Sequence, residues 1–591
     1  MPDTSRRPGR ALPGAVVGGV LALPVAGLII SQGMLGATGG GVPPGVLFVL
    51  YAAATGVAIG LVVGYQPKGL AAAAAGGMVL GLLGWLVCWL TLDPLLHAHL
   101  PTWSAAAAAH AYPSLVGDLL HGGVTGVVVH GVLSMRPRTV PDRRAGVETS
   151  APTRIVIVGA GFAGLAAAKR FERLALRGAP LDVTLISEAN FLLFTPMLAE
   201  VASSALEPAH ISAPVRAAVE HTRFRNGVVT GVDTRARTVL LSAGVMPGEP
   251  VLYDHLVLAV GSVPHFLDIP GVREHAGTLK DLPDATALRA QVIGVLEQAD
   301  QHGTSTADRR ALLTFVVAGG GFAGIEIVAE LFDLVHGVLR YFPGITADEP
   351  RFVLVHSRAG ILPELSTPLG EYALDRLRAR EIEFRLGVRV AGASAHDVEL
   401  SDGDRIAAKT FVWTAGNRAA PLVQTLDDAR RSKGALLTDP QLRVLGVEGV
   451  WAVGDCASIP DPDSDDAPYP PTAQHALRQG TVVADNIAAV IGGREPAAFR
   501  FRTIGVLVAL GRRTAVAEIR GHRFSGLVAW VLWRGIYLAK LPGLEKRVRV
   551  LLDWILDLVF PRDIVLTSRP STPAQAPGVE APDRVPTGQT R

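Results

Sequence analysis

The stretch that decides the fold is 153-TRIVIVGAGFAG-164. An apolar, β-rich run stops at Gly159, and Gly161 and Gly164 complete the pattern G-x-G-x-x-G before the helix-favouring run LAAAKRFERLAL. The first glycine permits a tight turn, the second lets a phosphate approach the backbone, and the third lets the helix pack closely on the strand. The N–H groups at the start of the helix then face the anion. The stretch predicts a dinucleotide-binding module with cofactor contacts at Gly159, Gly161, Phe162, Ala163 and Gly164.

A second β-rich run, 183–186, ends in Ser187 and Glu188. Glu188 lies about 20 residues beyond the last glycine, which is where an acid that binds the cofactor ribose is expected. Ser187 and Glu188 are therefore candidate cofactor contacts.

Composition limits the classes of protein to which the chain can belong. Its 591 residues are too many for one core and predict about three or four domains. The hydrophobic content of 49% and charged content of 18% predict that part of the chain lies in lipid. A net charge of +2, with no basic patch interleaved with aromatics, argues against nucleic-acid binding. Cys88 and Cys456 form no C-x-x-C pair, so we predict neither a metal site nor a redox-active dithiol.

The first 135 residues predict a bundle of four transmembrane helices. Four apolar stretches are each about long enough to cross a ~30 Å hydrocarbon core. Basic residues lie before the first stretch, between the second and third, and after the fourth, which places both ends of the bundle in the cytoplasm. We therefore expect a multi-pass protein of a bacterial-type inner membrane with its catalytic part on the cytoplasmic side; a cleaved signal peptide is the alternative for the first stretch. The predicted spans are 11–30, 46–65, 70–92 and 115–135.

A second strand–glycine–helix unit is 315-FVVAGGGFAGIEIVAEL-331. Each unit is followed by a strand that ends in glycine and resembles the segment that leads the chain back out of a dinucleotide-binding module. These segments are 257-VLAVGS-262 and 411-FVWTAG-416. Two such units resemble the two-dinucleotide flavoprotein architecture, which implies FAD in the first module and NAD(P)H in the second. The further positions implied to contact the dinucleotides are Ala259, Gly261, Gly319, Gly321, Phe322, Ala323, Gly324, Ala415 and Gly416.

Further segments resemble those of type II NADH dehydrogenases, the single-chain flavoprotein NADH:quinone oxidoreductases. The segment 190-NFLLFTPML-198 is similar to the family's N-Y-x-x-F-x-P-L-L. The segment 473-AQHALRQG-480 is similar to A-Q-x-A-x-Q-x-G, with Arg478 where the second glutamine is usual. The segments 449-GVWAVGDCA-457 and 547-RVRVLLDWILDLVFPRDIV-565 also match, so the resemblance covers about 153–566.

The resemblance implies roles for individual residues. Asp455 would hydrogen-bond the ribityl chain of FAD, and either Ser187 or Glu188 would meet its ribose. Glu326 would lie near flavin and nicotinamide, orienting the nicotinamide or relaying a proton; an acid favourably placed near a helix N-terminus is the alternative. Gln474 would line the quinone pocket and act in catalysis. The remaining implied FAD contacts are Thr195, Pro196, Gly454, Ala473, Gln474 and His475.

The next strand of the second module ends in 356-HSR-358. An acid at such a strand end binds the 2′-hydroxyl of NADH and repels the 2′-phosphate of NADPH. His356 removes that repulsion, and Arg358 can pair with a phosphate. With Ser357 as a third cofactor contact, the sequence yields the hypothesis that NADPH is tolerated, or even used, beside NADH.

The predicted fold class is α/β, with two Rossmann-like domains of the glutathione-reductase-like type, an all-α four-helix membrane bundle and C-terminal amphipathic helices within 524–560. Trp, Tyr and basic residues beside an apolar face favour helices lying in the membrane interface. The predicted division is a bundle (1–135), a linker (136–152), an FAD-binding domain in two parts (153–283 and 411–500), an NAD(P)H-binding domain (284–410), a cap with docking helices (501–566) and a disordered tail (567–591).

The function expected from this resemblance is a membrane-associated NAD(P)H:quinone oxidoreductase that uses FAD and does not pump protons. Its expected partners are a membrane quinone and the lipid bilayer, and a homodimer is left open. A reductase of a protein acceptor such as ferredoxin and a membrane flavin redox sensor are the alternatives. Sulfide:quinone oxidoreductases and disulfide reductases need redox cysteines that this chain lacks.

Overall fold

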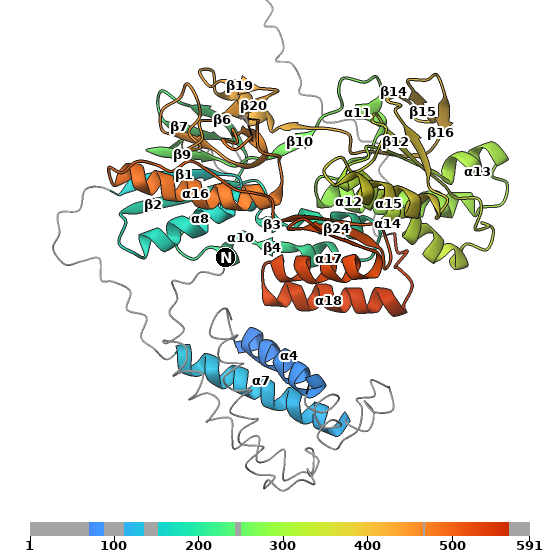
Figure 1. Cartoon of the computed structure of the whole chain (residues 1–591), viewed down its shortest axis with the longest axis horizontal. Helices are drawn as coiled ribbons and strands as arrows, with labels where there is room; N and C mark the ends of the chain where they lie inside the picture. Colours follow the sequence, from blue (N-terminus) through green and yellow to red (C-terminus); the bar gives the residue numbers. More distant parts are fainter. Residues whose placement is uncertain (1–69, 88–111, 135–151, 243–249, 465–466, 567–591) are drawn as a thin grey trace, which may run out of the picture. The chain divides into compact units, whose positions relative to one another are not determined.

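The computed structural model describes residues 70–87, 112–134, 152–242, 250–464 and 467–566. The chain divides into two compact units, Met1–Val147 and Glu148–Arg591. In the first unit, α4 (Leu70–Val87) packs against α7 (Tyr112–Ser134) through glycines (Figure 1). A Cβ added to Gly77 would lie 1.9 Å from the carbonyl oxygen of Gly122, so only small residues allow the two backbones to approach this closely.

The structure describes only part of the predicted membrane bundle. The predicted spans 11–30 and 46–65 lie outside the described residues, whereas 70–92 and 115–135 correspond to α4 and α7. Across the described ranges, no helix combines the length and the apolarity required to cross a membrane. The structure describes the third predicted span over Leu70–Val87, and residues 88–92 of that span lie outside the described residues. The predicted tail at 567–591 and all but one residue of the predicted linker at 136–152 are also outside the described residues.

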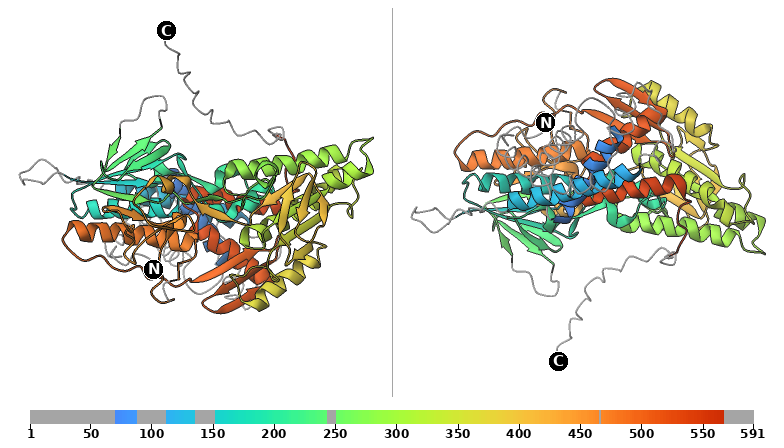
Figure 2. Two further views of the ribbon diagram at one scale, coloured as in Figure 1. Left: turned by 90° about the horizontal axis from the view of Figure 1, so that it is seen from above. Right: turned by 90° about the horizontal axis from the view of Figure 1, so that it is seen from below.

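The first module of the second unit is a parallel sheet in the order β21-β9-β1-β2-β5. Alternate residues of β1 face opposite sides: Ile155 and Ile157 pack with α8 and α16, and Val156 and Val158 pack with the β6–β7 hairpin. The helices α8 and α16 lie side by side on one face of this sheet (Figures 1 and 2). The elements are β1 (Thr153–Val158), α8 (Phe162–Ala175), β2 (Leu181–Ser187), β5 (Arg223–Asn226), β6 (Val229–Asp233), β7 (Thr238–Leu241), β8 (Val251–Leu252), β9 (His255–Leu258), β21 (Val450–Ala452) and α16 (Ala473–Ile491).

The second module repeats this plan with a parallel sheet in the order β13-β12-β11-β17. The helix α12 begins at Leu282, where Asp281 caps it by accepting a hydrogen bond from the Asp284 N–H. The elements are α12 (Leu282–Ala299), α13 (Thr306–Leu312), β11 (Thr314–Ala318), α14 (Phe322–Val338), β12 (Arg351–His356), α15 (Thr367–Arg378), β13 (Glu383–Leu386), β14 (Val390–Ala393), β15 (Asp397–Leu400), β16 (Arg405–Ala407) and β17 (Thr410–Trp413).

Two short antiparallel strands connect the modules. They are β10 (Ser262–Pro264) and β18 (Asn417–Ala419), and each directly follows the returning strand of one module. The remaining elements are short: β3 (Phe191–Leu193), η3 (Thr195–Met197), α9 (Leu198–Ala202), η4 (Pro208–Ile211), β4 (Ser212–Pro214), α10 (Val215–Ala218), α11 (Val272–His275), η5 (Leu339–Tyr341), η6 (Pro421–Thr425), β19 (Arg431–Ser432), β20 (Ala435–Leu437), η7 (Gly454–Cys456) and β22 (Ala457–Ser458).

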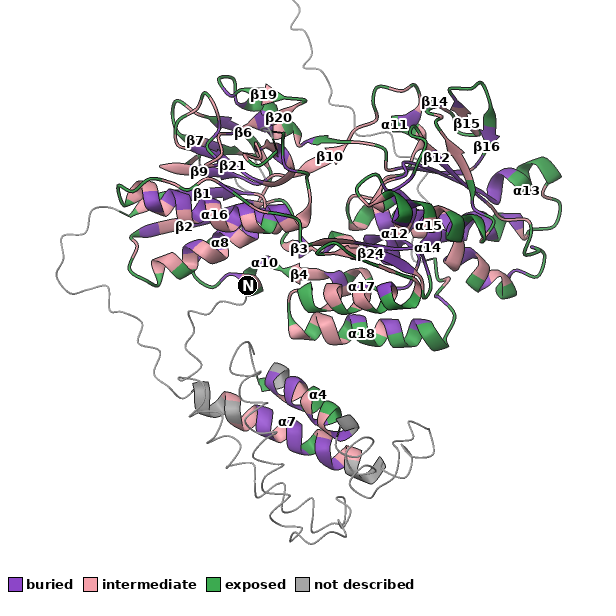
Figure 3. Cartoon of the chain, in the orientation of Figure 1, coloured by how far each residue is buried: buried purple, intermediate pink, exposed green. Residues whose placement is uncertain are grey.

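The C-terminal part is an antiparallel sheet followed by two amphipathic helices. The sheet is β23 (Gly505–Ala509), β24 (Ala515–Ile519) and β25 (His522–Ser525), and the helices are α17 (Gly526–Lys540) and α18 (Leu544–Val559). The two helices confirm the amphipathic segments expected within 524–560. The largest core cluster joins α9, α12 and α14 to this sheet and these helices, whereas the outer face of α18 is exposed (Figure 3).

Candidate active site

The first glycine turn has the geometry of a phosphate cradle. Gly159 adopts a φ of +101°, which disfavours a side chain, and a Cβ on Gly164 would lie 1.8 Å from the carbonyl oxygen of Gly159. Among the described residues, no atom lies within 4 Å of a Cβ built on Gly161. The same part of the chain supplies no side-chain cap to the start of α8. The turn is therefore open where an anion would meet the first N–H groups of α8, which begins with Phe162 and Ala163.

The starts of η7 and α16 converge on the start of α8. Gly454 has a φ of +73°, and its N–H donates to Oε1 of Gln479 at 2.8 Å. A Cβ on Gly480 would lie 2.0 Å from the carbonyl oxygen of Ala163, so α16 touches the backbone of α8. The side chain of Thr472 accepts from the His475 N–H and so caps the start of α16.

The first turn of α16 holds the predicted positions 473–475. Nε2 of Gln474 donates to the carbonyl oxygen of Gly505 at 2.7 Å, which ties this turn to β23. His475 is buried beside Tyr469, and burial lowers its pKa. Arg478 donates to the carbonyl oxygen of Gln474 and lies 3.9 Å from the ring centre of Phe501.

Asp455 belongs to a contact that the sequence reasoning missed. The Ser262 hydroxyl donates to Oδ2 of Asp455 at 2.8 Å, and Nζ of Lys280 donates to the Ser262 hydroxyl at 2.8 Å. Lys280 also lies 3.9 Å from Asp455, and burial lowers the pKa of this lysine. Three segments far apart in the chain thus meet at the residue expected to bind the ribityl chain.

The predicted ribose contacts lie at the carboxyl end of β2. Ser187 is the last residue of the strand, and Glu188 follows it with an exposed side chain. Nδ2 of Asn226 donates to the carbonyl oxygens of both residues, at 3.0 and 2.6 Å. The structure therefore holds both positions at one edge of the sheet, next to the glycine turn.

The other predicted contacts of the first module lie in three places. Thr195 and Pro196 open η3. Ala259 is buried after β9, where a Cβ on Gly159 would lie 2.3 Å from its carbonyl oxygen. Gly261 has a φ of +69° just before β10.

The second glycine turn repeats the first. Gly319 has a φ of +120°, and a Cβ on Gly324 would lie 1.9 Å from the carbonyl oxygen of Gly319. Gly321 precedes α14, which begins with Phe322 and Ala323 and has no side-chain cap among the described residues. The returning strand β17 ends beside this turn, with Ala415 and Gly416 following it; the N–H of His265 donates to the Gly416 carbonyl at 3.0 Å.

His356 packs directly on the second glycine turn. It is the last residue of β12 rather than the first residue after the strand, and Ser357 and Arg358 follow with exposed side chains. The Gly320 N–H donates to Nδ1 of His356 at 3.0 Å, so a proton on the ring resides on Nε2. That Nε2 is buried and has no hydrogen-bond partner in the described part of the chain. Burial, and then the charge of Arg358, lower the pKa of His356 and keep the ring neutral.

Glu326 lies in the second turn of α14 and is surrounded by protein, although its side chain keeps some accessible surface. Its Oε1 accepts a hydrogen bond from the Ala509 N–H at 3.2 Å. Burial raises the pKa of Glu326 to about 8, so the carboxyl is largely protonated at neutral pH. Glu330 lies four residues further along the same helix and is buried as well.

A row of aromatic rings leads from the first glycine turn to the C-terminal helices. Phe162 and Phe194 meet edge to face with ring centres 6.0 Å apart, and Phe194 meets Tyr537 in the same way at 6.0 Å. Tyr537 lies 4.7 Å from Trp533, which lies 6.2 Å from Trp554. The candidate cofactor site is therefore joined by packing to α17 and α18.

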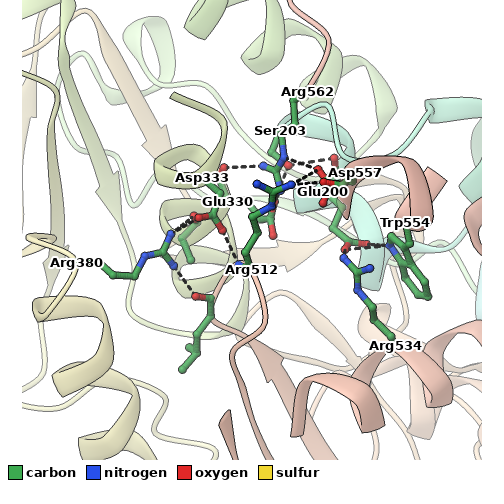
Figure 4. Close-up of polar contacts among 12 residues, drawn as sticks. Glu200, Ser203, Glu330, Asp333, Arg380, Arg512, Arg534, Trp554, Asp557 and Arg562 are labelled. Carbon is green, nitrogen blue, oxygen red and sulfur yellow. Dashed lines mark hydrogen bonds and ion pairs between the residues drawn. The ribbon is translucent and has the colours of Figure 1, made fainter. Parts of the chain in front are cut away.

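A buried polar network, missed in the sequence, joins α9, α14, α17 and α18 (Figure 4). Arg562 pairs with Glu330 at 2.9 Å and with Asp557 at 3.0 Å, and the Ser203 hydroxyl donates to Glu330 at 2.7 Å. Nε1 of Trp554 donates to both carboxyl oxygens of Glu200, at 3.1 and 3.2 Å. The local sequence feature that could have indicated this network is an acid, Glu200, inside the apolar run MLAEVA.

The residues present fit two dinucleotides. Each module offers a glycine turn at a helix start without a side-chain cap among the described residues, which is the arrangement that binds a pyrophosphate; the first turn is open at Gly161, whereas Oε1 of Glu364 lies 3.7 Å from a Cβ built on Gly321. Cys456 is buried after Asp455, and burial raises its pKa to about 11, so it remains a thiol at neutral pH. Cys88 lies outside the described residues.

Comparisons with known proteins agree with this architecture. Residues 153–480 match the family model for pyridine nucleotide-disulphide oxidoreductases, and residues 504–563 match the NDH2 C-terminal domain. A probable NADH dehydrogenase of Dictyostelium discoideum is 32% identical over 418 residues, which are 70% of this chain and 90% of that protein. The type II NADH:quinone oxidoreductase Ndh of Mycobacterium tuberculosis is 31% identical over 431 residues, with the same coverage of 70% and 90%.

The solved structure of NDH2 from Plasmodium falciparum in complex with NADH has a TM-score of 0.65 and 19% identity to this chain. It covers 70% of this chain and 99% of that one, and the likeness shows a shared fold. The two family models and the two relatives assign the family, with residues 153–480 and 504–563 matched by the models. The chain belongs to the pyridine nucleotide-disulphide oxidoreductase family and, within it, to the type II NADH dehydrogenases.

Proposed function

We propose that this chain is an FAD-dependent NADH:quinone oxidoreductase that does not pump protons. The observation that carries the proposal is the presence of two glycine turns at helix starts in one chain, with the second module sharing a core with the C-terminal sheet and two amphipathic helices. The Mycobacterium tuberculosis relative is named for the same reaction. We assign 153–283 and 411–500 to FAD, 284–410 to NADH and 501–566 to the cap and membrane contact.

Bound FAD would accept a hydride from NADH and pass two electrons to a quinone. The N–H groups that follow Gly159 and Gly161 would hold its pyrophosphate, and Asp455 would accept hydrogen bonds from its ribityl hydroxyls. The positive end of α16, which begins at Ala473, would stabilise negative charge on the flavin ring. The turn that begins at Gly319 would hold NADH in the same way.

The outer faces of α17 and α18 are suited to a bilayer surface. Large apolar side chains are exposed along both helices, and Lys540, Lys546, Arg547 and Arg549 lie at and beyond their junction. Exposed apolar patches flanked by basic residues are typical of helices in the membrane interface. A lipid-soluble quinone would then enter beside Tyr537, from which the row of aromatic rings leads to the first glycine turn. The exposed apolar residues are Leu527, Val528, Val531, Leu551, Leu552, Ile555, Leu556, Leu558, Val559 and Phe560.

One experiment separates this function from the alternatives. Purified protein should show a flavin spectrum that bleaches on addition of NADH and recovers rapidly when a soluble quinone analogue is added. A spectrum that bleaches and stays bleached under excess quinone would refute quinone reduction and favour a redox sensor. Recovery with ferredoxin alone would indicate a reductase of a protein acceptor.

A further inference from the structure

The side chain of Lys280 connects the second module to the first. The backbone just before it follows β17, because the N–H and carbonyl groups of Gly277 both hydrogen-bond to the backbone of that strand, each at 2.8 Å. Lys280 nevertheless reaches Ser262 at the start of β10 and Asp455 in η7. A residue held beside the second sheet therefore contacts the aspartate that is expected to bind the ribityl chain of FAD.

The backbone of Lys280 is held in place by the cap of α12. Its N–H donates to Oδ2 of Asp284 at 2.7 Å, and the Thr278 hydroxyl donates to the same oxygen at 2.7 Å. Asp284 in turn donates its own N–H to Asp281, the N-cap residue of the helix. These bonds fix the point from which the lysine side chain extends, so less conformational entropy is lost when its ammonium group meets its partners.

The Lys280 ammonium group and the Ser262 hydroxyl occupy one oxygen of Asp455. Nζ of Lys280 donates to the Ser262 hydroxyl at 2.8 Å, that hydroxyl donates to Oδ2 of Asp455 at 2.8 Å, and Nζ lies 3.9 Å from Oδ2. The lysine and aspartate side chains keep 34% and 28% of their accessible surface. In the described part of the chain, Oδ1 of Asp455 has no hydrogen-bond partner, so it is available to accept from the hydroxyl of a ligand.

Lys280 also balances the charge of Asp455. Among the described residues, it is the one basic side chain that forms an ion pair with this aspartate. Burial lowers the pKa of Lys280, and the charge of Asp455 acts against that shift, so the pair favours the ammonium form. Transfer of a hydride to neutral flavin adds one proton and two electrons and therefore leaves one extra negative charge. Without the lysine, that charge would face an unbalanced carboxylate.

We propose that Lys280 is a positioning residue that raises the redox potential of bound FAD. It balances the charge of Asp455, and through Ser262 it keeps Oδ1 of that carboxylate directed to the ribityl hydroxyls. The proposal deepens the proposed function and rests on it for the place of FAD. The flavin of the first module is then tuned by a side chain that the second module holds in place.

The test variant is Lys280→Gln in the full-length holoenzyme, because glutamine keeps an N–H donor for Ser262 but carries no charge. Loss of a charge beside an ionised group shifts its equilibria by about one order of magnitude. The oxidised form of the flavin should therefore be favoured about tenfold, which is a potential about 30 mV lower for a two-electron couple. The measurement is the midpoint potential of the bound flavin, obtained by equilibration with a reference dye.

Two matched variants should keep the wild-type potential. Lys280→Arg changes the shape of the side chain but retains its charge. Lys433→Gln removes the same charge from an exposed lysine in the turn between β19 and β20, which forms no ion pair with Asp455. A lysine with a purely structural role would lower the midpoint of urea unfolding in Lys280→Gln while the retained FAD kept its potential.

Ser262→Ala separates the two parts of the proposal. It removes the relayed hydrogen bond but keeps the charge of Lys280, so the potential should stay the same while more FAD is lost during gel filtration. If Lys280→Gln loses FAD on purification, the same tenfold shift is measured by titrating its apoprotein with oxidised FAD and with dithionite-reduced FAD. The ratio of the two affinities then replaces the potential.

The outcomes separate this proposal from the proposed function. An unchanged potential in Lys280→Gln, in an enzyme whose wild-type flavin is reduced by NADH and reoxidised by quinone, overturns the role of Lys280 alone. An equal shift in Lys280→Arg or in Lys433→Gln also overturns it. Undiminished retention of FAD by Ser262→Ala overturns the part assigned to Ser262. A wild type that holds no flavin, or whose flavin quinone cannot reoxidise, overturns the proposed function first.

Discussion

Replacing His356 with aspartate tests whether this position sets the choice between NADH and NADPH. The ring packs on the second glycine turn, accepts the Gly320 N–H through Nδ1, and is neutral at pH 7 because its pKa is lowered. An aspartate in the His356→Asp variant could accept the same N–H but would add a negative charge at the strand end, beside the expected ribose site.

The magnitude follows from the charge that is added. Two unit charges about 4 Å apart repel by about 4 kcal/mol at an effective dielectric constant of about 20. The strand end is partly exposed, and the neighbouring Arg358 is exposed, so solvent screening reduces this to about 2 kcal/mol. Since 1.36 kcal/mol is a factor of ten, kcat/KM for NADPH should fall about 30-fold. The value for NADH should stay the same or rise, because a carboxylate binds the 2′-hydroxyl.

The assay is steady-state oxidation of NADPH and NADH with the same soluble quinone, comparing the ratio of the two kcat/KM values. His396→Asp is the control, because His396 is exposed in the turn between β14 and β15 of the same module. The reasoning is refuted if the wild type already oxidises NADPH thousands of times less efficiently than NADH. It is refuted equally if the ratio is the same in His356→Asp and the wild type.

Three further changes test the core, the cofactor cradle and the membrane face. Arg562→Ala leaves Glu330 buried without its ion pair and should lower the free energy of unfolding by about 3–5 kcal/mol. The midpoint of urea unfolding should fall accordingly, and an unchanged midpoint would contradict this. Gly164→Ala places a Cβ 1.8 Å from the Gly159 carbonyl oxygen and should abolish flavin absorbance. Gly337→Ala is the control and should retain flavin, because a Cβ at Gly337 meets no described atom within 4 Å. Flavin bound to both variants would contradict the role of the first glycine turn in binding FAD. Val559→Asp places a charge at a position that is 73% exposed, so thermal stability should be unchanged. Cosedimentation with anionic lipid vesicles should be lost, and full cosedimentation would argue against membrane docking by α18.

The sequence alone determined the elements whose physics is local. A glycine that must adopt a positive φ, a threonine that caps a helix and an amphipathic period each act over a few residues. The two glycine turns at Gly159 and Gly319, the cap at Thr472 and the helices α17 and α18 were therefore predictable. Apolar composition was a weaker guide, because it does not by itself show that a helix is able to cross a membrane; in the described part of the chain, no helix is both long and apolar enough.

Only the tertiary structure decided which distant side chains meet. Ser262 and Lys280 reach Asp455 from more than 170 residues away in the chain, and Trp554 reaches Glu200 across 354 residues. Such contacts leave no periodic or short-range signal, because they depend on how whole sheets and helices pack together. The pKa of a carboxyl group depends on those neighbours and on burial. The raised pKa of Glu200 could therefore not be predicted from the residues next to it in the sequence.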